Sequence, residues 1–96
     1  RHSALLEKSV QKVTVLGGTG SFAVKNAIQA NADVFLTADL KYHNFYESEN
    51  QLVLADIGHF ESERFTKNYI VDFLKKKIPN FAIIFSEENT NPVKYL

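Results

Sequence analysis

The sequence contains no cysteine and no methionine, and its charges favour neither sign. The absence of cysteine excludes disulfide bonds and thiolate metal ligands. Eleven basic and eleven acidic side chains cancel at neutral pH. A chain without net positive charge lacks the usual electrostatic basis for binding nucleic acid polymers.

Long hydrophobic runs are absent as well. No apolar stretch approaches the roughly 20 residues of a membrane-spanning helix, and no signal-peptide pattern opens the chain. We therefore expect a cytoplasmic protein without a membrane partner. Because a natural reading frame begins with methionine, we expect a chain that begins at Arg1 to be part of a longer protein.

The residues that are present are typical of a globular domain. Ninety-six residues, 45% of them apolar, suit one hydrophobic core. Four buried-strand patterns, at residues 12–16, 33–37, 51–56 and 81–85, alternate with helical patterns. This alternation is typical of a parallel sheet flanked by helices. We predict a single α/β domain over residues 1–96, layered, with a mainly parallel four-stranded sheet.

The longest predicted helix spans residues 60–77. Its apolar positions recur at helical spacing and predict a stripe that faces the core. The apolar stripe consists of Phe65, Tyr69, Ile70, Phe73, Leu74 and Ile78. Shorter helices are predicted at residues 21–30 and 40–49. We expect the aromatic side chains of residues 40–49 to serve core packing.

Polar segments follow the first three predicted strands. They are Gly17–Gly20, Asp39–His43 and Gly58–Glu63. In open α/β sheets, ligands bind outside the carboxyl ends of the strands. If these strands are parallel, the three segments gather at one edge and form one site.

The glycine segment has two interpretations. The stretch Gly18-Thr19-Gly20-Ser21-Phe22-Ala23 fits a variant of the dinucleotide-binding fingerprint, and Asp39 follows at the spacing of a ribose-binding acid. The alternative is a tight strand-to-helix turn that needs glycine for conformational reasons. The motif is short, and the turn is favoured over a nucleotide site.

Two carboxylate–histidine pairs follow strands at this edge. His59 and Glu63 share one face if a helix begins there, and together they can ligate a divalent metal. Asp39 and His43 can act as ligands or as acid and base. In the alternative, Asp39 and Glu63 only stabilise helix starts, His43 lies on a solvated face, and His59 is a satisfied turn residue. For either pair alone, that alternative is favoured.

The segments in combination resemble a known family. Their order is strand, Gly-Gly-Thr-Gly-Ser and helix, then residues 32–43, then Asp56-Ile57-Gly58-His59-Phe60-Glu61-Ser62-Glu63, and last Asn91-Pro92-Val93. This resembles the C-terminal half of the Nif-three-like dinuclear metal-centre proteins, often named GTP cyclohydrolase one, type two. The resemblance covers almost the whole chain from Val13 onward.

The resemblance implies a metal-dependent hydrolase. Family members are toroidal homohexamers whose subunits hold two divalent metals, here of unknown identity among zinc, iron and manganese. By this likeness His59 and Glu63 are metal ligands, while Asp39 and His43 support the site or transfer protons. The family usually has glycine where this chain has Ala38.

The remaining ligands of the family, a histidine pair and an aspartate, belong to a half that this sequence lacks. We therefore expect an incomplete site, with weak metal binding or none in this fragment and activity only in the full-length protein. GTP is the substrate that the family name suggests. Alternatives are a nucleotide-binding module that uses Gly17–Gly20, or an oligomeric scaffold with a vestigial site.

Overall fold

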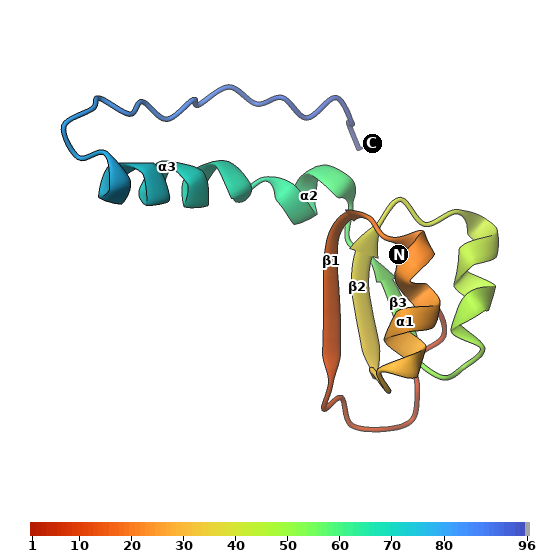
Figure 1. The fold of residues 1–96 in the computed structure, drawn as a ribbon. Helices are drawn as coiled ribbons and strands as arrows, with labels where there is room; N and C mark the ends of the chain where they lie inside the picture. The colour runs from red at the N-terminus through yellow and green to blue at the C-terminus, as the bar shows by residue number, and fades with distance from the viewer. Residues whose placement is uncertain (96) are drawn as a thin grey trace. The chain divides into compact units, whose positions relative to one another are not determined.

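The computed structural model describes residues 1–95. The chain forms two compact units, one from Arg1 to Glu63 and one from Arg64 onward. The first unit holds the sheet, and the second holds one helix and the C-terminal segment (Figure 1). All four candidate site residues lie in the first unit.

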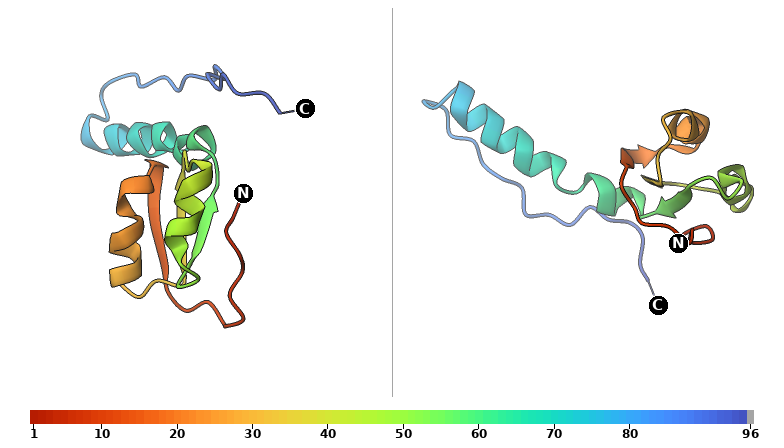
Figure 2. Two further views of the ribbon diagram at one scale, coloured as in Figure 1. Left: turned by 90° about the vertical axis from the view of Figure 1, so that its right-hand side faces the viewer. Right: turned by 90° about the horizontal axis from the view of Figure 1, so that it is seen from below.

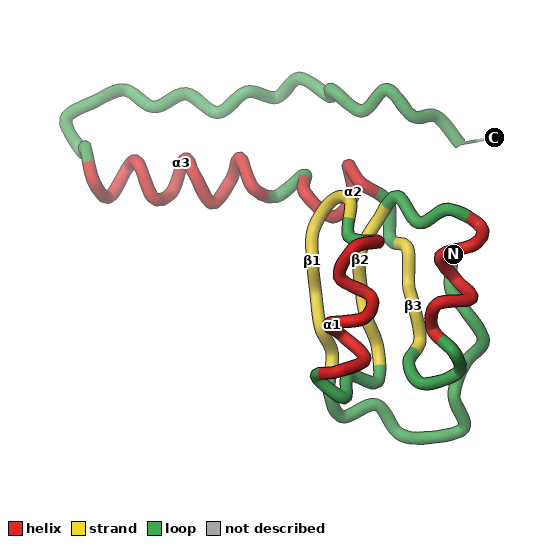
Figure 3. Tube along the Cα trace, turned by 45° about the vertical axis from the view of Figure 1, so that its right-hand side comes forward, coloured by secondary structure: helices red, strands yellow, loops and turns green. Residues whose placement is uncertain are grey.

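The sheet consists of three parallel strands that lie side by side in the order β1-β2-β3 (Figure 3). They are β1 (Val13–Thr19), β2 (Val34–Ala38) and β3 (Val53–Asp56). The α/β class and the parallel direction are confirmed. β1 runs farther than predicted, to Thr19, which pairs with Ala38 after the register of the pairing shifts between Val15 and Thr19.

The prediction of a fourth strand at residues 81–85 is wrong. These residues are irregular and pair with no strand within the part of the chain that is described, so the sheet there has three strands. Phe81 and Ile84 are 73% and 89% exposed. A continuous apolar run indicates burial, but a strand also needs a neighbouring backbone to accept and donate its hydrogen bonds.

Helices cover one face of the sheet. They are the short 3-10 helix η1 (Ser21–Ala23), α1 (Val24–Gln29) and the 3-10 helix η2 (Tyr42–Ser48) (Figure 2). Alternate strand residues such as Phe35 and Leu54 face these helices, as the two-residue period of a strand requires. The buried core comprises Val24, Ala27, Ala32, Phe35, Leu40, Leu52 and Leu54.

The helix predicted over residues 60–77 is two helices. α2 (His59–Glu63) belongs to the first unit and α3 (Thr66–Lys77) to the second. Five side chains of the apolar stripe, Phe65, Tyr69, Ile70, Phe73 and Ile78, are 46% to 73% exposed, so the stripe is not the core face we expected. No helix within residues 1–95 is long and apolar enough to cross a membrane.

Candidate metal centre

The segments after the three strands meet at the carboxyl edge of the sheet, as predicted. Asp39 follows β2, and its carboxylate oxygen Oδ2 accepts hydrogen bonds from two other segments. One donor is the hydroxyl of Thr19 at the end of β1, and the other is Nδ1 of His59, 2.6 Å away. A single carboxylate therefore links the ends of β1 and β2 to the start of α2.

Asp39 adopts a backbone conformation that is unusual for a residue with a side chain. Its φ is 57°, in the left-handed region, which aspartate tolerates better than most residues. Non-glycine residues in this region are frequent at functional sites, where the surrounding structure holds them in place. The turn directs the Asp39 carboxylate toward His59 and away from a helix-capping role.

His59 and Glu63 lie one turn apart on α2, as their spacing predicted. The atom Nε2 of His59 is 3.2 Å from Oε2 of Glu63. The side chains of Asp39, His59 and Glu63 are 44%, 49% and 51% exposed. The three side chains thus form a line, carboxylate–imidazole–carboxylate, that remains open to solvent.

A serine that the motif analysis did not single out attaches α2 to β1. The hydroxyl of Ser62 accepts a hydrogen bond from the backbone N–H of Gly18 at 2.9 Å and donates one to the carbonyl of His59 at 2.8 Å. Gly18 has φ 67°, and a Cβ added there would lie 2.5 Å from Oε1 of Glu63. The glycine therefore makes room for the Glu63 carboxylate.

The glycine segment is committed to contacts within the protein. The N–H of Gly18 binds Ser62, and the N–H of Gly20 binds the carbonyl of Ala38 at 3.4 Å. A phosphate site needs such N–H groups to be free at a helix start, and the helix that follows, η1, has only one turn. This geometry favours the tight turn over a nucleotide cradle.

Electrostatics reinforce the contact between Asp39 and His59. Hydrogen bonds from Thr19 and then from His59 hold the pKa of Asp39 below its usual value. The hydrogen bond to Asp39, aided by the nearby charges of Asp39 and Glu63, raises the pKa of His59. Because these groups are about half exposed, solvent screens the pair and its effect on stability is small.

The directions of these two pKa shifts determine how the contribution of the Asp39–His59 pair to stability depends on pH. The contribution of His59 is complete below the ordinary imidazole pKa and is lost as pH rises through its raised value. The contribution of Asp39 is complete above the ordinary carboxyl pKa and is lost as pH falls through its lowered value. The ion pair therefore stabilises the fold most at mildly acidic pH.

The donor atoms of His59 and Glu63 suit a divalent transition metal, which binds imidazole nitrogen and carboxylate oxygen. Two ligands, however, are fewer than the three protein ligands of a typical catalytic zinc site. Within residues 1–95 no group of three or more histidine, aspartate or glutamate side chains is placed to hold a metal ion. The two ring nitrogens of His59 contact different carboxylates, Nδ1 that of Asp39 and Nε2 that of Glu63.

His43 does not join this cluster. The side chain is exposed, and its ring meets Tyr42 edge-on with ring centroids 5.3 Å apart. No hydrogen bond or ion pair links it to Asp39 in the described part of the chain. Its assignment as a proton-transfer group stays a prediction.

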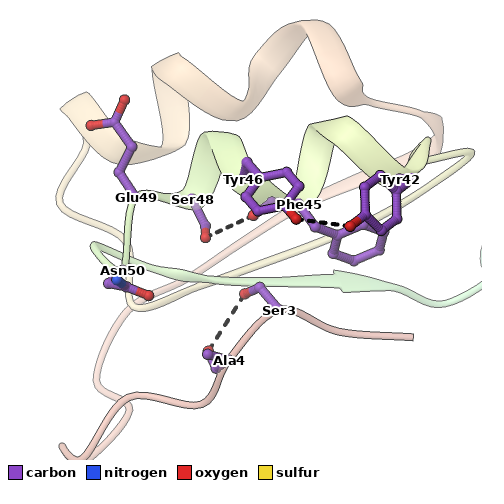
Figure 4. A pocket seen from close by; sticks show the side chains of 8 residues that line it. All are labelled: Ser3, Ala4, Tyr42, Phe45, Tyr46, Ser48, Glu49 and Asn50. Carbon is purple, nitrogen blue, oxygen red and sulfur yellow. Dashed lines mark hydrogen bonds between the residues drawn. The ribbon is translucent and has the colours of Figure 1, made fainter.

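A separate hollow of about 420 Å³ lies beside η2. It is lined by Ser3, Ala4, Tyr42, Phe45, Tyr46, Ser48, Glu49 and Asn50 (Figure 4). The hydroxyls of Tyr42 and Tyr46 are hydrogen-bonded at 2.8 Å, which raises the pKa of Tyr46. Of the three aromatic side chains, only Phe45 packs against the core; both tyrosines are exposed.

The fold and this arrangement define an α/β protein with candidate ligands at the carboxyl edge of a parallel sheet. More particularly, the chain belongs to the Duf34/NIF3 (NGG1p interacting factor 3) family, whose profile matches residues 1–92. The resemblance drawn from the motifs is thereby confirmed.

Individual relatives agree with this assignment. A GTP cyclohydrolase 1 type 2 homolog of Staphylococcus epidermidis is 38% identical over 99% of this chain and 27% of its own length. A GTP cyclohydrolase 1 type 2 homolog of Campylobacter jejuni is 34% identical over 93% of this chain and 35% of its own length. The crystal structure of a Bacillus cereus protein related to NIF3 superposes with a TM-score of 0.88 at 31% identity, over 100% of this chain and 28% of that one. The chain thus spans about a third or less of these proteins.

Proposed function

We propose that the full-length protein is a dinuclear-metal-dependent hydrolase and that this chain supplies two of its metal ligands, His59 and Glu63. One observation carries the proposal. Asp39 lies against Nδ1 of His59, while Nε2 lies beside Glu63. Histidines that bind metals commonly donate their other ring N–H to a carboxylate, which fixes the tautomer and the orientation of the ring.

Each residue of the line has a distinct task in this proposal. Asp39 accepts a hydrogen bond from Nδ1–H of His59 and so favours the tautomer in which Nε2, on the side of Glu63, is unprotonated. Thr19 orients Asp39 through its hydroxyl, and Ser62 holds α2 against the end of β1. His43 and Asp39 remain candidates for moving protons to and from the substrate.

The metals, when bound, would supply Lewis acidity for activating water and stabilising developing negative charge. Zinc, iron and manganese all accept this donor type. We propose that the remaining ligands come from the rest of the full-length protein, since two ligands are fewer than the three that catalytic zinc usually keeps. A homohexamer and a nucleotide substrate such as GTP are further parts of the proposal, supported by the family and the names of the relatives.

The test is the metal content of the purified full-length protein, measured by mass spectrometry beside variants. We expect His59→Ala and Glu63→Ala to lose one or both metals. His2→Ala is the matched control, because His2 is exposed and lies outside the cluster, and it should keep the metal content of the wild type. Unchanged metal in His59→Ala would refute the assignment and would favour a scaffold with a vestigial site.

A further inference from the structure

A buried carboxylate lies directly beneath the candidate site. The side chain of Asp56, the last residue of β3, is only 4% exposed. Its oxygen Oδ1 accepts a hydrogen bond from the backbone N–H of Gly58 at 3.1 Å, and Oδ2 accepts one from the N–H of Leu40 at 3.1 Å. The guanidinium of Arg1 also donates to Oδ2.

The two backbone donors adjoin the two central residues of the site. Leu40 directly follows Asp39, and Gly58 directly precedes His59. The two oxygens of one carboxylate therefore hold the segment after β2 and the segment after β3 to each other. Arg1 adds to this connection, because its Nη2 donates to the carbonyl of Leu40 at 3.0 Å as well as to Asp56.

This connection bears on the backbone of Asp39, because the left-handed conformation costs energy even for aspartate and persists only where the surrounding structure holds it. The N–H of Leu40 donates a hydrogen bond to Asp56, and the carbonyl of Leu40 accepts one from Arg1. These two hydrogen bonds fix the backbone that follows Asp39. With the backbone in this position, the Asp39 carboxylate lies 2.6 Å from Nδ1 of His59.

We propose that Asp56 is a positioning residue that sets the distance between Asp39 and His59 and, through it, the orientation of the His59 ring. The part of this proposal that concerns metal affinity rests on the proposed function; the part that concerns the ring does not. Asp56 itself touches neither a metal nor a substrate in this scheme.

The substitution Asp56→Asn tests the proposal because it keeps the shape and removes one acceptor. An ionised carboxylate offers acceptor atoms to both N–H groups, whereas an amide presents its NH₂ group to one of them. One N–H is then left without a partner in a buried place, and its segment moves to find one.

The first readout is metal affinity of the full-length protein. Removing a group that orients a ligating histidine typically weakens metal binding about 10- to 100-fold, and we expect a loss in this range for Asp56→Asn. Leu54→Val is the matched control, since Leu54 is fully buried on the same strand and its apolar side chain accepts no hydrogen bond from either segment. Wild-type affinity in Asp56→Asn, or an equal loss in Leu54→Val, would overturn the proposal.

The second readout needs no metal. Two-bond nitrogen–proton correlation spectra of the metal-free, full-length protein report which ring nitrogen of His59 carries the proton. We expect the Nδ1–H tautomer in the wild type and in Leu54→Val, and a shift toward Nε2–H in Asp56→Asn. If the wild type binds no metal, the proposed function fails, and this spectrum alone decides the role of Asp56.

Arg1→Ala keeps the test decisive if Asp56→Asn does not fold. The side chain of Arg1 is 67% exposed, so its removal leaves the core intact while it releases both Leu40 and Asp56. We expect a weaker shift in the same direction in the His59 spectrum. An unchanged spectrum in this variant would contradict the proposed connection.

Discussion

Gly18 offers the sharpest test of how the chain makes room for the candidate ligands. In the variant Gly18→Ala, the new Cβ would lie 2.5 Å from Oε1 of Glu63 and 3.3 Å from Cε1 of His59. The backbone at this position has φ 67°, which glycine adopts freely and alanine does not. The substitution therefore perturbs the backbone and the Glu63 side chain at once.

The effect on the backbone and the effect on the Glu63 side chain differ in magnitude, and different assays detect them. Placing alanine in the left-handed region costs about 1–2 kcal/mol, which should appear as a lower free energy of unfolding in urea titrations. Glu63 is half exposed and can swing aside, so the clash adds little to that loss. The swing does remove the carboxylate from Nε2 of His59, and we expect weaker metal binding by the full-length protein.

Gly17→Ala is the matched control one residue away. Its φ is not positive, and its Cβ would meet its nearest neighbour, Cγ of Glu63, at 3.7 Å, an ordinary contact. Where alanine fits the native backbone, it stabilises a protein by about 0.4–1 kcal/mol relative to glycine. The two neighbouring substitutions should thus have opposite signs. Equal effects, or a stabilising Gly18→Ala, would refute the role assigned to Gly18.

Three further predictions concern neighbouring residues. Metal binding by the full-length protein should strengthen as pH rises through the raised pKa of His59, because the protonated ring cannot bind a metal. In Asp39→Asn, calorimetric titrations should show that the increase in metal affinity occurs at lower pH. Gly20→Ala should lower the free energy of unfolding by about 1–3 kcal/mol, measured in urea, because its Cβ would lie 1.9 Å from Oγ1 of the buried Thr37. Leu54→Ala should cost about 2–5 kcal/mol in the same assay, since Leu54 is fully buried; a smaller loss would mean that the core is not centred there.

Short sequence patterns predicted those parts of the fold that depend on neighbouring residues alone. Nearly continuous apolar runs gave the three parallel strands, and strand direction then placed Thr19, Asp39 and His59 at one edge. The same rule failed at residues 81–85, because a sequence pattern measures apolarity and cannot supply the pairing partner. The apolar stripe of α3 shows the same limit, since periodicity predicts that a face will be covered without naming what covers it.

Contacts that depend on the precise turn were not predicted. Ser62, Thr19 and Asp56 are small polar residues at element ends, where their types are also common as caps and turns. Nothing in their spacing distinguishes a hydroxyl that joins α2 to β1 from one that faces water. Only the fold makes such a residue part of the site.

The candidate site differs from the predicted pairing for one physical reason. The argument that residues four apart share a face holds only within a helix. It applies to His59 and Glu63, which lie on α2, and there the contact forms. It does not apply to Asp39 and His43, because Asp39 turns into the left-handed region and the helix η2 begins only at Tyr42. Asp39 is thereby free to pair across the sheet edge with His59, and two apparent pairs become one line of three side chains.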